Sequence, residues 1–200
     1  MTYKFQTPAI FLIGPTASGK TETSLRLAEK FPLEIISVDS AMVFKEMNIG
    51  TCKPSLQNLE NVPHHLIDIL QPDAEFDVGI FIRYVDSAIQ TIIQNKKIPL
   101  FVGGTMMFHK VLFDGIHDFP RDDGLREEIE HIRRNKGYQL LLDELKLLDP
   151  ETFQLIDKKN PRRVQRALEI IKLTKTKLSL LKKEPSKKFL NSENCLILGM

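Results

Sequence analysis

The feature that most constrains this chain is a glycine-rich loop between an apolar strand pattern and a helix pattern. The loop reads Gly-Pro-Thr-Ala-Ser-Gly-Lys-Thr at 14–21, after an apolar run at 9–13 and before a helical pattern at 22–30. A G-x-x-x-x-G-K-[ST] loop in this context is typical of phosphate binding. Its glycines let successive backbone N–H groups converge on one anion, while the helix N-terminus and the lysine add positive charge.

The loop therefore predicts a site for a diphosphate or a triphosphate. The hydroxyl of Thr21 is placed to ligate Mg²⁺, which is the expected cofactor. A tight turn with this sequence by chance is the alternative, and both flanking patterns count against it. The residues expected to bind the phosphates are Gly14, Pro15, Thr16, Ala17, Ser18, Gly19, Lys20 and Thr21.

Composition excludes a membrane-spanning chain. Of the 200 residues, 42% are hydrophobic and 27% are charged, as in ordinary soluble globular chains. No apolar run approaches the ~20 residues that a membrane span needs, so we expect no membrane partner. The two cysteines, Cys52 and Cys195, lie far apart without metal-like spacing, which favours reduced thiols and a cytoplasmic protein.

Short apolar runs alternate with helical patterns in the first half of the chain. Asp77 is expected to cap a helix in which apolar residues recur at helical spacing. This alternation predicts an α/β fold, a P-loop NTPase-like parallel sheet flanked by helices, as the core over 1–117. The expected strands after the first are 34–38, 65–70 and 98–102.

Ligands of such sheets bind at the carboxyl ends of the strands. Asp39 and Ser40 follow the second expected strand, and a Gly103-Gly104-Thr105 turn follows the fourth. We therefore expect these residues to share one rim with the phosphate loop.

The pattern after Pro120 is helical. Apolar residues recur at helical spacing, and Asn160-Pro161 provides a cap and a first helical position. We expect an all-helical insertion at 118–190, followed by a core strand within 191–200. A buried parallel strand normally leads into a covering helix, so the core is expected to be truncated after this strand.

The insertion concentrates the positive charge of the chain. Residues 158–188 contain twelve Lys or Arg and two Glu, a net charge of +10, whereas the rest of the chain carries −8. Such a block is typical of a face that binds a polyanion, although a solvated helix face would have the same composition.

Several motifs occur in a specific order: Asp39-Ser40-Ala41 after the phosphate loop, then 47–54, 63–68, 103–105, and 160–163 with 166–169. In this the chain resembles the tRNA dimethylallyltransferases of the IPP transferase family. Family enzymes are longer, so the resemblance covers their first two-thirds and implies that a C-terminal core segment is missing. It also implies transfer of a dimethylallyl group from dimethylallyl diphosphate to N6 of the adenosine at position 37 of tRNA, adjacent to the anticodon.

The resemblance implies roles for individual residues. From the residues alone Asp39 is either a general base or a Mg²⁺ ligand, and the resemblance favours the base. It implies Asp39, Lys20 and Thr105 as the catalytic residues. It also implies a monomer that binds the tRNA anticodon stem-loop and dimethylallyl diphosphate. The implied tRNA-binding residues are Asp39, Ser40, Ala41, Met42, Thr105, Arg126, Arg162, Arg163, Val164, Gln165 and Arg166.

This chain departs from the family pattern at three positions. Most members have an aspartate where Asn48 stands and tyrosines where Phe44 and Phe108 stand. The tandem His64-His65 lacks a third metal ligand, so structural hydrogen bonding is the expected role. Lys53 could contact a phosphate, although a single lysine is a weak signal. The alternative functions are a small-molecule P-loop kinase and an inactive tRNA-binding fragment.

Overall fold

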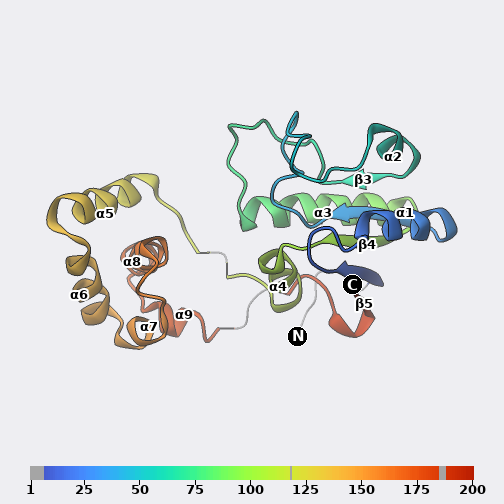
Figure 1. Cartoon of the computed structure of the whole chain (residues 1–200). Coiled ribbons are helices and arrows are strands. Elements are labelled where there is room, and N and C mark those ends of the chain that lie inside the picture. Colours follow the sequence, from blue (N-terminus) through green and yellow to red (C-terminus); the bar gives the residue numbers. More distant parts are fainter. Residues whose placement is uncertain (1–6, 118, 185–187) are drawn as a thin grey trace. The chain divides into compact units, whose positions relative to one another are not determined.

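The computed structural model describes residues 7–117, 119–184 and 188–200, and these residues form two compact units. One unit comprises Met1–Ile116 and Lys187–Met200, and the other comprises His117–Ser186. The first contains the sheet, and the second consists of helices in its described residues (Figure 1). The residues that lead into β5, including Phe189 and Leu190, belong to the core of the sheet unit, whereas the expected insertion extended to 190.

The sheet unit contains five parallel strands in the order β3-β2-β4-β1-β5. The fold is therefore an α/β fold with a parallel sheet flanked by helices, as the sequence predicts. The strands are β1 (Ala9–Ile13), β2 (Leu33–Ser37), β3 (His64–His65), β4 (Ile98–Gly103) and β5 (Cys195–Gly199). The helices are α1 (Lys20–Lys30), α2 (Leu56–Asn61), α3 (Val78–Gln94), α4 (Met106–Asp114) and the short 3₁₀ helix η1 (Ser192–Asn194).

Successive strand residues point to opposite faces of the sheet, and each face packs against different helices. Phe11, Ile36 and Phe101 pack with the buried residues of α3 and α4. Their neighbours Leu12, Ile35 and Leu100 pack with the apolar residues of α1. The sheet is therefore covered on both faces, which explains the near-continuous apolar sequence of its strands.

The third strand is shorter than the sequence predicts. The expected strand spanned 65–70, but the observed strand ends at His65. Leu66 and Asp68 have φ angles of 65° and 53°, which break the extended backbone. Only Leu70 returns to a strand-like position, as an isolated bridge with Phe44.

β5 forms one edge of the sheet and pairs only with β1. Two of its apolar side chains, Leu196 and Ile197, are 54% and 53% exposed. The pairing with β1 continues one residue past β5, because the Met200 N–H donates to the carbonyl of Ile13 at 2.9 Å. An apolar edge of this kind favours association with another strand.

The helical unit contains α5 (Asp123–Lys136), α6 (Tyr138–Leu148), α7 (Pro150–Leu155), α8 (Pro161–Thr174) and α9 (Leu178–Leu181). Asn160 caps α8 by accepting from the Arg163 N–H, and Pro161 takes the first helical position, as expected. Lys175, with a φ of 54°, ends α8, so the segment at 178–181 forms a separate helix. In the described part of the chain, no helix combines the length and apolar character that a membrane crossing requires.

Candidate functional site

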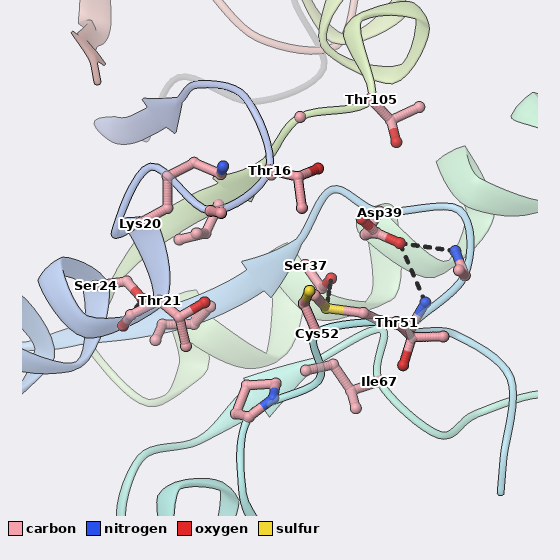
Figure 2. A pocket seen from close by; sticks show the side chains of 18 of the residues that line it. Thr16, Lys20, Thr21, Ser24, Ser37, Asp39, Thr51, Cys52, Ile67 and Thr105 are labelled. Carbon is pink, nitrogen blue, oxygen red and sulfur yellow. Dashed lines mark hydrogen bonds between the residues drawn. The ribbon is translucent and has the colours of Figure 1, made fainter. Parts of the chain in front are cut away.

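A cavity of about 770 Å³ lies at the carboxyl ends of the central strands. Figure 2 shows Lys20 and Thr21 on one side of it and Asp39 and Thr105 on another, with Thr16 between them. The lining residues come from the phosphate loop and α1, from β2 and the turn after it, from 50–54, from 64–67 and from the end of β4. Those predicted as site residues are Pro15, Thr16, Ala17, Gly19, Lys20, Thr21, Asp39, Ser40, Ala41, Met42 and Thr105.

The phosphate loop has the backbone that its sequence predicts. Gly19 has a φ of 87° at the position before α1, a conformation that favours glycine. The Lys20 ammonium reaches back over the loop, donating to the carbonyl of Pro15 at 2.5 Å and to the Ser18 hydroxyl at 3.4 Å. A positive charge, a helix N-terminus and the loop amides therefore meet at one end of the cavity.

Close packing of the ends of β2 and β4 joins two other predicted site segments. A Cβ atom at Gly103 would overlap the carbonyl of Val38, so only glycine allows this approach. The Thr105 N–H donates to the same carbonyl at 3.3 Å, and the Val38 N–H donates to the carbonyl of Val102 at 2.8 Å. The backbone of Thr105 is therefore tied to the residue that precedes Asp39.

Asp39 is half-buried, and its carboxylate is held by a tight turn. Its Oδ1 accepts from the backbone N–H groups of Ala41 at 2.8 Å and Met42 at 3.2 Å (Figure 2). Within the described residues, no hydrogen-bond partner is found for Oδ2. One oxygen thus fixes the side chain, and the other remains able to accept a proton or a hydrogen bond in the cavity.

The rest of the cavity wall has a largely apolar lining, in which only Met42 was assigned a binding role from the sequence. It includes Ile35, Met42, Cys52, Pro54, Ile67 and Val102, together with His64. The residues from 50–54 and 64–67 lie in segments that carried the family resemblance, which was the only signal that could have identified them. The cavity therefore combines an anion-binding end with an apolar wall.

The tandem histidines have structural hydrogen bonds. The His64 Nδ1–H donates to the carbonyl of Val62 at 2.7 Å, and burial lowers the pKa of this imidazole, which favours the neutral form. His65 Nε2 lies 2.7 Å from Oε2 of the buried Glu34, whose other oxygen accepts from Asn95. No group of three or more potential metal ligands occurs among the described His, Cys, Asp and Glu residues.

Lys53 is not among the residues that line the cavity, and its ammonium is bound within the protein, so the structure lends no support to the suggested phosphate contact. Its ammonium is almost fully buried and pairs with Asp68 at 2.6 Å. It also donates to Asn48 Oδ1 at 3.2 Å, which gives this departure from the family pattern a structural role. These contacts consume the charge that a phosphate would need.

In the helical unit, the predicted RNA-binding arginines fall into two groups. Arg126 and Arg166 donate to the fully buried Glu169, at 3.0 Å and 2.8 Å. Arg162 and Arg163 are exposed on the first turn of α8. Arg166 is partly buried by its bond to Glu169, whereas Arg162 is exposed.

Two other predicted RNA contacts in α8 lie among structural residues. The Val164 side chain is fully buried in the core of the helical unit, so a side-chain contact with RNA does not fit its position. Gln165 donates through Nε2 to the backbone carbonyl of Arg126 at 2.9 Å. Both residues therefore stabilise the packing of α8 against α5.

Comparisons with known proteins agree on one family. The IPP transferase family matches residues 42–200. A eukaryotic dimethylallyltransferase acting on tRNA is 30% identical with a TM-score of 0.80, over 97% of this chain and 48% of its own. A tRNA isopentenylpyrophosphate transferase from Bacillus halodurans is 39% identical with a TM-score of 0.55, over 84% of this chain and 56% of its own.

A tRNA delta(2)-isopentenylpyrophosphate transferase from Staphylococcus epidermidis is 33% identical with a TM-score of 0.52, over 92% of this chain and 62% of its own. This chain thus spans about half to three-fifths of the length of these solved structures. The family match covers most of the chain, from Met42 onward, and includes the segments at 50–54 and 64–67 and the helical unit, whereas the phosphate loop and Asp39 precede it. The chain belongs to the IPP transferase family.

Proposed function

We propose that this chain transfers a dimethylallyl group from dimethylallyl diphosphate to N6 of the adenosine next to the anticodon of tRNA. The observation that carries the proposal is one cavity that contains both an anion-binding loop and the carboxylate of Asp39, in a chain of the IPP transferase family. The free thiols of Cys52 and Cys195 fit a cytoplasmic enzyme, which we propose to act as a monomer.

The phosphate loop would hold the diphosphate of the donor. When the allylic C–O bond breaks, negative charge develops on the bridging oxygen of the leaving pyrophosphate. The loop amides, the N-terminus of α1 and Lys20 are fixed around this position, so they would stabilise the transition state without reorganisation. The apolar wall would receive the five-carbon tail.

The hydroxyl of Thr21 fits a role in holding Mg²⁺. It lies in the cavity lining at the start of α1, and the described residues provide no acidic cluster that could hold a metal alone. This donor set suits Mg²⁺, which binds through few protein ligands together with phosphate oxygens and waters. When bound, the ion would neutralise charge on the diphosphate.

Asp39 would act as the general base. The exocyclic amine of adenine is a weak nucleophile that becomes acidic as it attacks the allylic carbon. Oδ2 of Asp39 can accept its proton, because Oδ1 already holds the side chain in place. General-base catalysis of this kind contributes about 10² to 10⁴ in rate.

The target base must leave the anticodon loop to enter the cavity. Ser40, Ala41, Met42 and Thr105 border the site beside Asp39, and they would contact the extruded adenosine. In the helical unit, the exposed Arg162 and Arg163 would contact phosphates of the RNA backbone.

The test is an assay of pyrophosphate release by the purified chain with dimethylallyl diphosphate and Mg²⁺. We expect release only when tRNA is present. Turnover of ATP with a small acceptor and without tRNA would support a kinase instead. Binding of tRNA without any release would identify an RNA-binding fragment and contradict the proposal.

A further inference from the structure

Beyond Ile35 of β2 and Val102 of β4, the apolar wall of the cavity is built from three separate chain segments. Met42 comes from the turn after β2, Cys52 and Pro54 come from the following loop, and Ile67 follows β3. Strand pairing alone cannot hold these segments, because β3 contains only His64–His65. Backbone hydrogen bonds between 42–45 and 68–70 join two of these segments, so the loop with Cys52 and Pro54 needs a further interaction.

The ammonium of Lys53 lies where the three segments meet. It donates to the carbonyl of Phe44 at 2.5 Å, to Asn48 Oδ1 at 3.2 Å and to Asp68 Oδ1 at 2.6 Å. The three N–H donors of a lysine are thereby all used. Its side chain is 4% exposed and that of Asp68 is 36% exposed, so the lysine end of these bonds is shielded from bulk water.

Each contact is close in sequence to a wall residue. Lys53 is itself flanked by Cys52 and Pro54, and Asp68 directly follows Ile67. The backbone extends the link, because the Asp68 N–H donates to the carbonyl of Met42 at 3.1 Å. A displacement of the ammonium would therefore move all three wall segments.

The backbone around this lysine adopts unusual conformations. Cys52, Leu66 and Asp68 have φ angles of 56°, 65° and 53°, although none of them is glycine. Such residues persist only where surrounding contacts determine the conformation, and they cluster at functional sites. The hydrogen bonds of Lys53 supply such contacts both to its own loop, which contains Cys52, and to the segment that contains Leu66 and Asp68.

We infer that Lys53 is a positioning residue that shapes the apolar wall for the hydrocarbon tail of the donor without contacting the diphosphate. The inference rests on the proposed function and names the part of the substrate that the lysine serves. It predicts that loss of the ammonium weakens binding of the hydrocarbon tail but not binding of the diphosphate. The phosphate loop, which lies on other elements, keeps its own contacts.

The experiment compares binding of two ligands by titration calorimetry, inorganic pyrophosphate and a non-reactive dimethylallyl thiodiphosphate. In Lys53→Met, we expect affinity for the thiodiphosphate to fall about tenfold. A fall of this size corresponds to the loss of contacts with roughly two buried methylene-sized groups. Affinity for pyrophosphate should stay within about twofold on the same scale. Lys45→Met removes an exposed lysine from the same segment and should change neither affinity.

A second variant separates positioning from simple unfolding. Removing Lys53 alone leaves the Asp68 carboxylate unpaired, which is more destabilising than removing the whole ion pair. We therefore expect Lys53→Met combined with Asp68→Asn, which removes the charge and suits the left-handed backbone at this position, to regain thermal stability by circular dichroism while the affinity for the thiodiphosphate stays low. Recovery of that affinity together with stability would overturn the positioning role.

Two other outcomes overturn the inference. Equal losses for both ligands, or no loss for either, would show that Lys53 does not serve the hydrocarbon tail. If the unmodified chain binds pyrophosphate and the thiodiphosphate with equal affinity, the proposed function fails and the inference fails with it. The unmodified chain thus tests the function, and the variants test the lysine.

Discussion

Asp39 shows how one turn orients a reactive group. Its Oδ1 is held by two backbone N–H groups, which leaves the direction of Oδ2 fixed by the local chain. In Asp39→Asn the turn is preserved, but the amide cannot accept a proton. We expect the prenylation rate to fall by about 10² to 10⁴ in single-turnover measurements.

The affinity of Asp39→Asn for tRNA should stay within a few fold. Asp73→Asn, at an exposed carboxylate, is the matched control and should keep the full rate. A near-normal rate for Asp39→Asn would assign the base to another group.

Lys20 provides the only full positive charge within the phosphate loop itself. Lys20→Ala should weaken binding of pyrophosphate by about 10- to 100-fold, because a hydrogen bond from a charged donor contributes roughly 1.5–3 kcal/mol. Titration calorimetry measures the change. Lys30→Ala, at the other end of α1, should leave the affinity unchanged, and equal effects of the two variants would point to general charge attraction.

At the scale of elements, the buried carboxylate of Asp149 joins two short helices of the helical unit. It accepts from the N–H and hydroxyl of Thr152 in α7 and from the N–H and hydroxyl of Ser179 in α9. Burial alone would raise the pKa of Asp149, but these four hydrogen bonds lower it to about 2. The ionised carboxylate therefore stabilises the folded unit.

We expect Asp149→Ala to lower the free energy of unfolding by about 2–3 kcal/mol at pH 7, because the change removes a helix cap and leaves donors of α9 unpaired. The lowered pKa sets the pH dependence. The stabilisation is complete above the ordinary pKa of 3.8 and is lost as pH falls toward about 2.

Urea denaturation of the unmodified chain and of Asp149→Ala between pH 7 and pH 2 measures the difference in their free energies of unfolding. The stability gap should narrow below about pH 4. Asp143→Ala, at an exposed position on α6, should cost little at any pH. A stability difference that stays constant down to pH 2 would mean that the ionised carboxylate of Asp149 is not its cause.

Much of the fold follows from the sequence at this scale. The strands at 9–13 and 98–103 and the helices that begin after Asp77 and Asn160 agree with their apolar periodicity and caps. The third strand differs from the sequence prediction, because the apolar run at 65–70 carries no signal for a left-handed backbone at Leu66 and Asp68.

The candidate site was predictable only in part. The phosphate loop and Asp39 are local signals, and parallel strands bring them together. The role of Lys53 was not predictable, because its partner Asp68 lies fifteen residues away on another segment. Likewise, nothing in the local sequence indicates that Glu169 would pair with Arg126, 43 residues earlier.

In the whole molecule, the helical unit is proposed to contribute to RNA binding through its exposed arginines. Replacing both Arg162 and Arg163 by Ala should weaken tRNA binding. It should also reduce the slope of log affinity against log salt by about 1.5, since each phosphate contact contributes roughly 0.7–0.9. Filter binding across a salt series gives the slope.

Arg26→Ala, on α1 of the sheet unit, is the control and should leave the slope unchanged. An unchanged slope in the double variant would remove the first turn of α8 from the RNA interface. Arg166 is unsuitable for this test, because its loss would leave Glu169 with fewer partners in the core.

The most direct test of the central claim is the identity of the modified nucleoside. The chain is incubated with dimethylallyl diphosphate labelled in its hydrocarbon tail and with tRNA, and the RNA is then digested to nucleosides and examined by mass spectrometry. We predict labelled N6-dimethylallyl adenosine from the position next to the anticodon, and at least about a hundredfold less in the same time with Asp39→Asn. Release of pyrophosphate with the label in a free alcohol and no modified adenosine would contradict the account.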